Sequence, residues 1–319
     1  MQLTKKVWQQ KNILSNFLYP FSYIYLLSYF VYRLFKSEKK LNIPIICVGN
    51  IVSGGAGKTP VSIELRKILS KRFKNIFILL RGYKGRKKGP LLVKKEDKYT
   101  DVGDESLIHS FFGKTCMSKD KVLGADYCLR RGGDLIIMDD GLQSIDVKRS
   151  INILVIDNEY KFGNKRIIPA GPLRQTIKSS ILMADFTFII GQKKTNFFEN
   201  LKFKNIFYAR KKIFIDTNKK NLYAFSGLGN NLSFFNSIKE SNYNLKKYKE
   251  FNDHHSYKDY EIEEMINESK KLKLQLVCTQ KDFIKINEKY KKFIIVVEMN
   301  LEFENIKALV RKLNDSLNV

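Results

Sequence analysis

A glycine-rich segment between an apolar run and a helical pattern is the feature that most constrains how this 319-residue chain can fold. The run Ile43–Val48 has the length and composition of a buried strand, and residues 58–69 have helical spacing. Between them lies Gly49–Pro60, which is rich in glycine. Glycines let backbone N–H groups surround an anion, and a helix N-terminus adds positive potential. The segment therefore predicts a phosphate-binding loop in an α/β nucleotide-binding domain.

The loop departs at one position from the usual spacing G-x-x-x-x-G-K-[ST]. That pattern requires glycine at position 52, where this chain has Val52. A glycine-rich turn before an ordinary helix is the alternative, but the intact Gly57-Lys58-Thr59 between a strand and a helix favours nucleotide binding. We expect Lys58 to reach the nucleotide's phosphates and Thr59 to bind Mg²⁺. The binding residues predicted in this way are Gly54, Gly55, Gly57, Lys58 and Thr59.

A pair of carboxylates directly follows the apolar run Leu135–Met138. Phosphate-loop enzymes hold Mg²⁺ with the help of an acidic group at the end of a neighbouring strand, and Asp139 and Asp140 meet this requirement. The alternative is a strand-ending turn, because Asp-Gly is a common turn pair. Two adjacent carboxylates after a buried strand favour the magnesium site.

Apolar runs of strand length recur along the chain, separated by lengths that suit helices. They are Ile76–Leu80, Ile151–Ile156, Phe186–Ile190, Leu222–Phe225, Leu274–Cys278 and Phe293–Val297. This pattern predicts an α/β fold with a mostly parallel sheet and helices on both faces. It restarts near residue 216, which indicates a smaller second α/β domain. The expected organisation is an N-terminal helix over 1–40, a nucleotide-binding domain over 41–212 with an exposed basic hairpin over 81–98, a linker around 211–220, and a C-terminal domain over 218–319.

The segment Asn12–Tyr32 is uncharged and rich in apolar and aromatic residues. As a helix it would extend about 32 Å, roughly the thickness of a bilayer's hydrocarbon core. Pro20 and several Asn and Ser side chains interrupt the apolar surface, and the segment's tyrosines prefer a membrane interface. Basic residues flank both ends, Lys5 and Lys6 among them. A helix that lies on or dips into an anionic membrane surface is the favoured interpretation, with a full span and a buried core helix as alternatives.

The net charge of +26 indicates an anionic partner, such as nucleic acid, anionic lipid or a phosphorylated substrate. Solvated lysines without a partner are the simpler alternative. Nucleic acid is not expected, because no motif that reads RNA or DNA accompanies the charge. The four cysteines lack C-x-x-C pairing, which indicates reduced thiols in a cytosolic setting.

Phosphoryl transfer to an alcohol requires a carboxylate or imidazole that accepts the hydroxyl proton. The segment Asp253-His254-His255 contains two of the three histidines, next to a carboxylate. Two adjacent histidines are often surface residues without a function, which is the alternative. Asp104 opens a predicted helix, where capping is the ordinary role of an acidic residue. Arg174, in the turn Pro169–Arg174, can clamp a phosphate with its planar guanidinium.

Together these segments resemble the tetraacyldisaccharide 4'-kinase family of lipid A biosynthesis. A match to any one segment is weak evidence for the family. Seven matches in the family's order, spanning nearly the whole chain, are specific evidence. The matching segments are Val48–Pro60, Arg81–Tyr83, Val102–Glu105, Asp139–Gln143, Pro169–Arg174, Asp253–His255 and Thr279–Asp282. The family's own phosphate loop is non-standard, which accounts for Val52.

The resemblance implies an enzyme at the cytosolic face of the inner membrane. It would transfer the γ-phosphate of ATP to the 4'-hydroxyl of a lipid A disaccharide 1-phosphate, and we expect it to be monomeric on an anionic membrane surface. The implied site residues are Lys58 and Thr59 for ATP; Thr59, Asp139 and Asp140 for Mg²⁺; Asp104 as proton acceptor, assisted by Asp253 and His254; and Arg81 and Arg174 for the substrate's phosphate.

At several positions the chain differs from the family's pattern, and there the family's residue roles cannot be assigned to this chain. Gln175 and Gln280 stand where the family commonly has Glu, so neither receives an acidic role, and Lys84 and Leu142 also differ. The other function considered is a membrane-associated P-loop ATPase that acts as a switch or partitioning protein, since Gly-Gly-Ala-Gly-Lys-Thr also occurs there. Those proteins carry a second loop lysine where Ser53 stands and need no Asp-His-His element, which favours the kinase.

Overall fold

The structure is a computed structural model that describes residues 7–55, 57–191, 197–198 and 200–317. Its strands are β1 (Ile45–Gly49), β2 (Ile76–Leu80), β3 (Leu91–Leu92), β4 (Thr115–Met117), β5 (Leu135–Asp139), β6 (Ile151–Asp157), β7 (Phe186–Ile190), β8 (Ile206–Ile215), β9 (Asn221–Ser226), β10 (Asn244–Glu250), β11 (Gln275–Thr279) and β12 (Ile294–Phe303). They form a twelve-stranded sheet in the order β10-β9-β11-β12-β8-β7-β6-β1-β5-β2-β4-β3. Among the described strands only β8 with β12 and β3 with β4 pair antiparallel, so the sheet is mostly parallel, as predicted.

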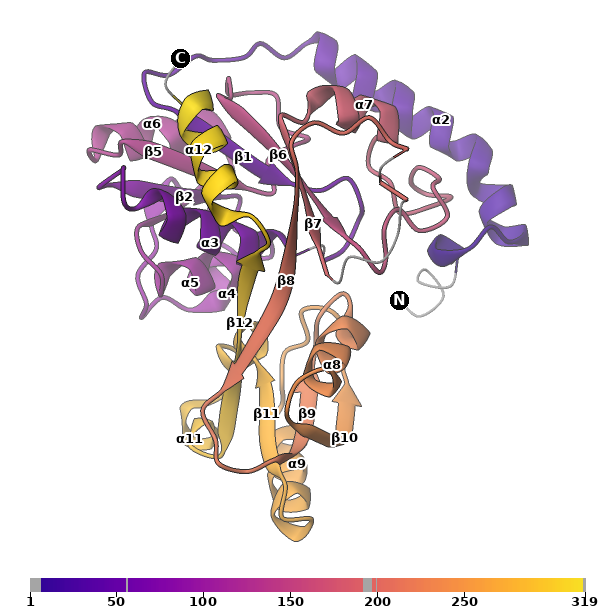
Figure 1. Cartoon of the computed structure of the whole chain (residues 1–319), viewed down its shortest axis with the longest axis vertical. Coiled ribbons are helices and arrows are strands. Elements are labelled where there is room, and N and C mark those ends of the chain that lie inside the picture. The colour runs from indigo at the N-terminus through magenta and orange to yellow at the C-terminus, as the bar shows by residue number, and fades with distance from the viewer. Residues whose placement is uncertain (1–6, 56, 192–196, 199, 318–319) are drawn as a thin grey trace.

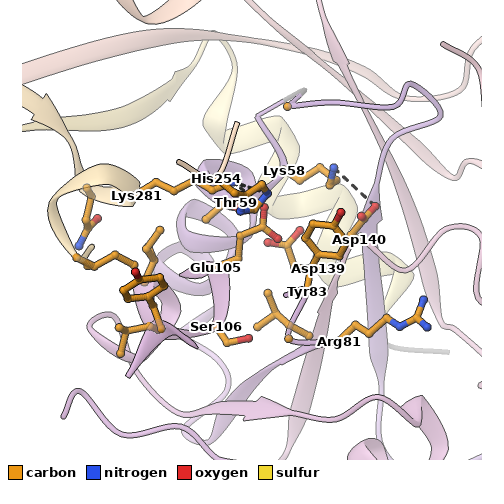
Figure 2. Close-up of a pocket in the computed structure, with 18 of the residues that line it drawn as sticks. Lys58, Thr59, Arg81, Tyr83, Glu105, Ser106, Asp139, Asp140, His254 and Lys281 are labelled. Carbon is orange, nitrogen blue, oxygen red and sulfur yellow. Dashed lines mark hydrogen bonds and ion pairs between the residues drawn. The ribbon is translucent and has the colours of Figure 1, made fainter. Parts of the chain in front are cut away.

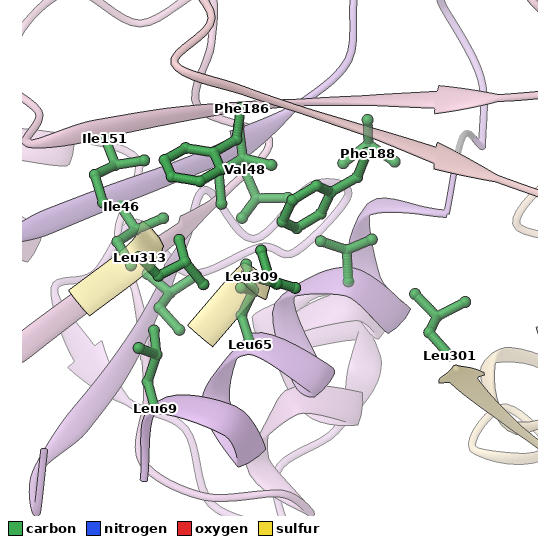
Figure 3. Packing of buried hydrophobic residues seen from close by; sticks show 14 of the residues in the cluster. Ile46, Val48, Leu65, Leu69, Ile151, Phe186, Phe188, Leu301, Leu309 and Leu313 are labelled. Carbon is green, nitrogen blue, oxygen red and sulfur yellow. The ribbon is translucent and has the colours of Figure 1, made fainter. Parts of the chain in front are cut away.

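Helices cover both faces of this sheet. They are α2 (Ile13–Leu34), α3 (Lys58–Leu69), α4 (Tyr99–Val102), α5 (Asp104–Ser110), α6 (Lys121–Arg130), α7 (Ile177–Met183), α8 (Asn231–Lys239), α9 (Asp259–Lys271), α10 (Gln280–Phe283), α11 (Glu288–Lys291) and α12 (Ile306–Ser316). Strand side chains alternate between faces. On β1, Ile46 and Val48 pack with α3 and α12 (Figure 3), whereas Ile45 and Cys47 pack into clusters on the other face.

Figure 1 shows a larger and a smaller part joined by the long strands β8 and β12. These strands pair from Ala209 with Phe303 to Ile215 with Val297. In the smaller part, α9 covers one face of β9 and β11, and α8 covers the other. Because one sheet runs through both parts, the position of one part is tied to that of the other through backbone hydrogen bonds.

Two expectations about local organisation were wrong, and three strands were missed. The expected linker around 211–220 lies partly in β8, which extends to Ile215. The segment 81–98 is not a hairpin, since its short strand β3 pairs with β4 instead. The strands β4, β8 and β10 had not been predicted at all. Strands β4 and β10 lack a long apolar run, and in β8 the two short apolar runs are separated by Arg210, Lys211 and Lys212.

The last helix also departs from the expected domain boundary. We had assigned residues 218–319 to the smaller domain, but Leu309 and Leu313 of α12 are fully buried in the core of the larger part (Figure 3). Strand β12 carries the chain back to that part, and α12 then packs beside α3. The C-terminal helix is therefore a component of the nucleotide-binding fold.

Helix α2 spans the uncharged N-terminal segment and contains Pro20. It buries the small polar Ser15 and Ser22, and Ser22 donates a hydrogen bond to the Ile167 carbonyl at 2.8 Å. Leu26 packs against the core, but most of the large apolar residues of α2 face outward, with Phe17 at 69% and Ile24 at 65% exposure, which excludes the buried core helix. Among the described residues, no helix is long and apolar enough to cross a membrane. The predicted basic flank at Lys5 and Lys6 lies outside the described residues.

Replacing Leu309 by Ala should lower the free energy of unfolding by about 2–5 kcal/mol, because it leaves a cavity between α12 and the sheet. Urea denaturation followed by circular dichroism measures the loss. The matched control is Ile306→Ala on the same helix, where the side chain is 41% exposed and the expected loss is within about 0.5 kcal/mol. Equal losses in the two variants would contradict the placement of α12 in the core.

Candidate active site

A large cavity opens where β1 and β5 end, between the two parts of the chain (Figure 2). Its volume is about 2310 Å³, beyond the ~300–1,000 Å³ of common single-ligand pockets, so it has room for two substrates. The predicted residues that line it are Gly54, Gly55, Gly57, Lys58, Thr59, Arg81, Asp139, Asp140, Arg174, Asp253 and His254. The side chain of Asp104 lies behind this lining and is 4% exposed.

The phosphate loop is shaped by a glycine and an asparagine. Gly57 precedes α3 with a φ of 81°, a left-handed conformation that favours glycine, and no side chain caps the helix. The first N–H groups of α3 are thus available to an anion. The Asn50 side chain donates to the carbonyls of Val52 at 2.8 Å and Gly54 at 3.3 Å, and its oxygen accepts from Lys58 at 3.2 Å. Sequence analysis had given Asn50 no role.

Asp140 lies between two cations. Its Oδ1 is 3.6 Å from Lys58 Nζ and 3.1 Å from Arg174 Nη1. Burial alone would raise the pKa of Asp140, but the charges of Lys58 and Arg174 hold it below its usual value. The predicted phosphate clamp Arg174 is therefore joined to a carboxylate of the predicted metal site.

Asp139 is buried and has one free oxygen. Its Oδ2 is 2.9 Å from His109 Nε2, and its Oδ1 has no hydrogen-bond partner among the described residues. A buried carboxylate oxygen without a partner is costly unless a cation or water satisfies it. Asp139, Asp140 and the Thr59 hydroxyl line one cavity and offer the hard oxygen ligands that Mg²⁺ prefers, so they fit this ion.

Asp104 begins α5 and meets residues from the smaller part. Its Oδ2 is 2.6 Å from His254 Nδ1, and its Oδ1 accepts the backbone N–H of Glu105 at 2.8 Å. The ammonium groups of Lys281 and Lys285 lie 3.9 and 3.8 Å from Oδ2. Burial opposes ionisation, but the hydrogen bond from His254 and the two lysines lower the pKa of Asp104. Asp104 is therefore an ionised carboxylate in a buried setting.

His254 presents its second ring nitrogen toward the cavity. Its Nε2 is 3.3 Å from Lys281 Nζ and 3.8 Å from Asp253 Oδ1. An ammonium group only donates, so Nε2 accepts and Nδ1 carries the hydrogen that is shared with Asp104. The ring packs against Tyr83, with centroids 5.3 Å apart. The structure thus brings Asp104, Asp253 and His254 together, and of these His254 and Asp253 line the cavity.

The two parts approach each other closely beside the phosphate loop. A Cβ atom added to Gly229 would lie 3.4 Å from the backbone nitrogen of Gly55 and 3.3 Å from Asp253 Oδ2. Both contacts are tight, so glycine at 229 lets the loop after β9 sit against the phosphate loop. The Asp253–His254 element is thereby held next to the nucleotide-binding residues.

Lys121 is a residue that sequence analysis missed. It begins α6, is 7% exposed, and its Nζ has no hydrogen-bond partner among the described residues. Burial lowers the pKa of Lys121, although the nearby carboxylates of Asp139 and Asp140 act to raise it. The residue lines the same cavity as the exposed Arg81. A single lysine at a helix start forms no motif, so only the fold reveals its burial.

The glutamines that depart from the family's pattern keep positions near the site. Gln175 is 4% exposed, and its Oε1 has no hydrogen-bond partner among the residues that the structure describes. Gln280 begins α10 and lines the cavity. Neither adds a negative charge to the site.

Comparison with known proteins decides the family. A family model described as tetraacyldisaccharide-1-P 4'-kinase (LpxK) matches residues 14–318. The chain belongs to the tetraacyldisaccharide 4'-kinase family. It is 32% identical to the tetraacyldisaccharide 4'-kinases of Rickettsia bellii and Paramagnetospirillum magneticum, with 98% of both chains covered in each case. A crystal structure of LpxK from Aquifex aeolicus in complex with ATP is similar with a TM-score of 0.75 and 26% identity, covering 95% of this chain and 99% of that one.

Membership of the tetraacyldisaccharide 4'-kinase family confirms several predictions. The family, the mostly parallel α/β fold, the kinase activity in lipid A biosynthesis and ATP as the nucleotide all agree with these relatives. The alternative of a switch or partitioning ATPase is not supported. Mg²⁺ and the roles of individual residues stay predictions.

Replacing Lys58 by Met should weaken ATP binding by about 10- to 100-fold, because a charge-assisted contact to phosphate is lost. Isothermal titration calorimetry with ATP measures the effect. Lys71→Met, at an exposed lysine just beyond the other end of α3, is the matched control and should bind ATP like the unmodified protein. Unchanged ATP affinity in Lys58→Met would contradict the phosphate-loop assignment.

Proposed function

We propose that this family member transfers the γ-phosphate of ATP to the 4'-hydroxyl of a lipid A disaccharide 1-phosphate, at the cytosolic face of the inner membrane. One observation carries the proposal. The imidazole of the hydrogen-bonded Asp104–His254 pair lines the same cavity as the phosphate loop. An alcohol acceptor needs such an acid–base pair beside the donor's phosphates.

The donor nucleotide occupies the phosphate loop in this proposal. The free N–H groups of α3 and the Lys58 ammonium bind its phosphates. Thr59, the free Oδ1 of Asp139, and Asp140 would hold Mg²⁺, which when bound neutralises charge on the transferred phosphoryl group. Arg174, next to Asp140, is placed to contact the same phosphates.

His254 and Asp104 together remove the proton from the acceptor hydroxyl. We had expected Asp104 to meet the hydroxyl itself, but both its oxygens are engaged and His254 is the member of the pair that lines the cavity. The proton therefore passes to His254 Nε2 while the hydroxyl oxygen bonds to the γ-phosphorus and ADP leaves. The Asp104 carboxylate stabilises the imidazolium that forms. Lys281, which borders Nε2, keeps Glu105 and Asp253 as ion-pair partners.

Arg81 and Lys121 are proposed to bind a phosphate of the acceptor. They line the cavity together, and the Lys121 ammonium lacks a hydrogen-bond partner among the described residues. Burying an unpaired ammonium group is costly, and a phosphate oxygen would relieve that cost. A disaccharide that carries a 1-phosphate supplies such a group.

Helix α2 is proposed to contact the membrane surface as part of a monomeric enzyme. It turns Ser15 and Ser22 toward the protein and most of its large apolar residues outward. The exposed apolar residues include Phe17, Phe21, Ile24, Leu27 and Phe30. Arg33 lies in its last turn, and anionic headgroups attract such basic residues. This arrangement supports a helix that lies in the interface, where a lipid acceptor is found.

The test of the proposed function is phosphate transfer in detergent, with γ-labelled ATP, Mg²⁺ and the disaccharide 1-phosphate. The expected result is label in the lipid, released by a phosphatase that removes the 4'-phosphate. No label in the lipid, together with ATP turnover that a protein or nucleic-acid partner stimulates, would overturn the proposal.

Asp104→Asn and His254→Gln should each lower kcat by about 10²- to 10⁴-fold, because the hydroxyl proton loses its acceptor or the acceptor loses its counter-charge. ATP affinity should stay within about threefold of the unmodified protein, since neither residue binds the nucleotide in this account. His255→Gln is the matched control. Its imidazole bonds to Glu261 at 2.9 Å outside the cavity lining, so kcat should be unchanged. Normal kcat in either catalytic variant would contradict its assigned role.

A further inference from the structure

His109 is a fully buried histidine that the proposed mechanism does not use. It is 0% exposed and lies in the last turn of α5, the helix that begins with Asp104. Its Nε2 is 2.9 Å from Asp139 Oδ2, and its Nδ1 has no hydrogen-bond partner among the described residues. A buried imidazole whose single polar contact is a carboxylate of the proposed metal site calls for an explanation.

The contact fixes which nitrogen of His109 carries the hydrogen. A carboxylate oxygen accepts, so Nε2 carries a hydrogen that it donates to Asp139 Oδ2. The same contact occupies one of the two oxygens of Asp139 and leaves Oδ1 without a partner. The contact holds the carboxylate in one orientation, with Oδ1 buried and without a partner among the described residues, at the edge of the cavity that Asp139 lines.

Arg66 holds the helix end that carries His109. Its guanidinium donates to the His109 carbonyl at 3.3 Å and also to the Lys114 carbonyl. At the other end of α5, Asp104 is fixed by His254 and Glu105. One short helix thus carries the carboxylate behind the proposed base and the imidazole that holds a proposed metal ligand.

We propose that His109 is a positioning residue for Mg²⁺. It orients the Asp139 carboxylate so that Oδ1 is left for the metal, and it lies on the same helix, α5, as Asp104. The inference rests on the proposed role of Asp139 in holding Mg²⁺. Partners of this kind, which orient a metal ligand without touching the metal, typically change metal affinity by about 10- to 100-fold.

The test measures metal binding directly, with Mn²⁺ as a spectroscopic substitute for Mg²⁺. Free Mn²⁺ is followed by electron paramagnetic resonance in the presence of ATP, for the unmodified protein, His109→Leu, His109→Gln and Ser110→Ala. His109→Leu removes the donor at similar volume, and we expect Mn²⁺ to bind about 10- to 100-fold more weakly. His109→Gln keeps an N–H donor at comparable reach and should restore affinity to within about threefold.

Ser110→Ala is the matched control, because its hydroxyl bonds only within α5 in the described structure, at 2.7 Å to the Leu107 carbonyl. It should bind Mn²⁺ like the unmodified protein. Metal-free ATP affinity should be the same in all four proteins, which a general loss of structure would not allow. Equal Mn²⁺ affinity in His109→Leu and the unmodified protein would overturn the inference alone. A failure of the unmodified protein to bind Mn²⁺ with ATP would instead overturn the proposed metal site.

Imidazole ¹⁵N NMR of the unmodified protein tests the same inference without any substitution. His109 should carry a hydrogen on Nε2, and its Nε2 signal should shift when Mg²⁺ is added with ATP. An Nε2 without a hydrogen, or no shift on addition of the metal, would overturn the positioning role even if His109→Leu fails to fold.

Discussion

The hydrogen bond between Asp104 and His254 is the interaction on which the rest of the site depends. It joins residues that are 150 positions apart, one at the start of α5 and the other in the loop after β10. The carboxylate is ionised within a buried setting because His254, Lys281 and Lys285 surround it. That arrangement gives the imidazole a fixed hydrogen position and a counter-charge, which is what a base beside a phosphate-binding loop requires.

A continuous sheet fixes the relative positions of the two parts that carry Asp104 and His254. The antiparallel pair β8 and β12 extends the sheet from the larger into the smaller part, and α12 returns to pack beside α3. The chain therefore crosses between the parts more than once, and Gly229 allows the smaller part to approach the phosphate loop. Packing of the core and placement of the catalytic groups are in this way consequences of the same topology.

Features that depend on neighbouring residues could be predicted from the sequence. The phosphate loop, α3 and the carboxylates after β5 each follow from a short apolar run and the residues directly after it. Strand β10, in which exposed and half-buried side chains alternate and lysines occur at both kinds of position, has no apolar run and was missed. The antiparallel β8–β12 pair was missed for a related reason, since its partners are far apart in the chain.

The candidate site shows the same difference between features that depend on neighbouring residues and features that depend on the tertiary structure. The residue types were found from motifs, but which group faces the substrate depends on burial, and burial is a tertiary property. The sequence alone could not reveal that His254 covers Asp104, that Lys121 is buried without a partner among the described residues, or that His109 contacts Asp139. Family resemblance implied that Asp104 is the proton acceptor, and the geometry supports the proposal that Asp104 and His254 share this role.

The central claim is that Asp104 and His254 act as one unit in the chemical step. A double-mutant cycle on kcat for phosphate transfer, with Asp104→Asn, His254→Gln and the double variant, tests this most directly. The account predicts that the double variant loses little more activity than the worse single variant, because each substitution already disables the pair. Losses that multiply in the double variant would show that the two residues act independently and would contradict the account.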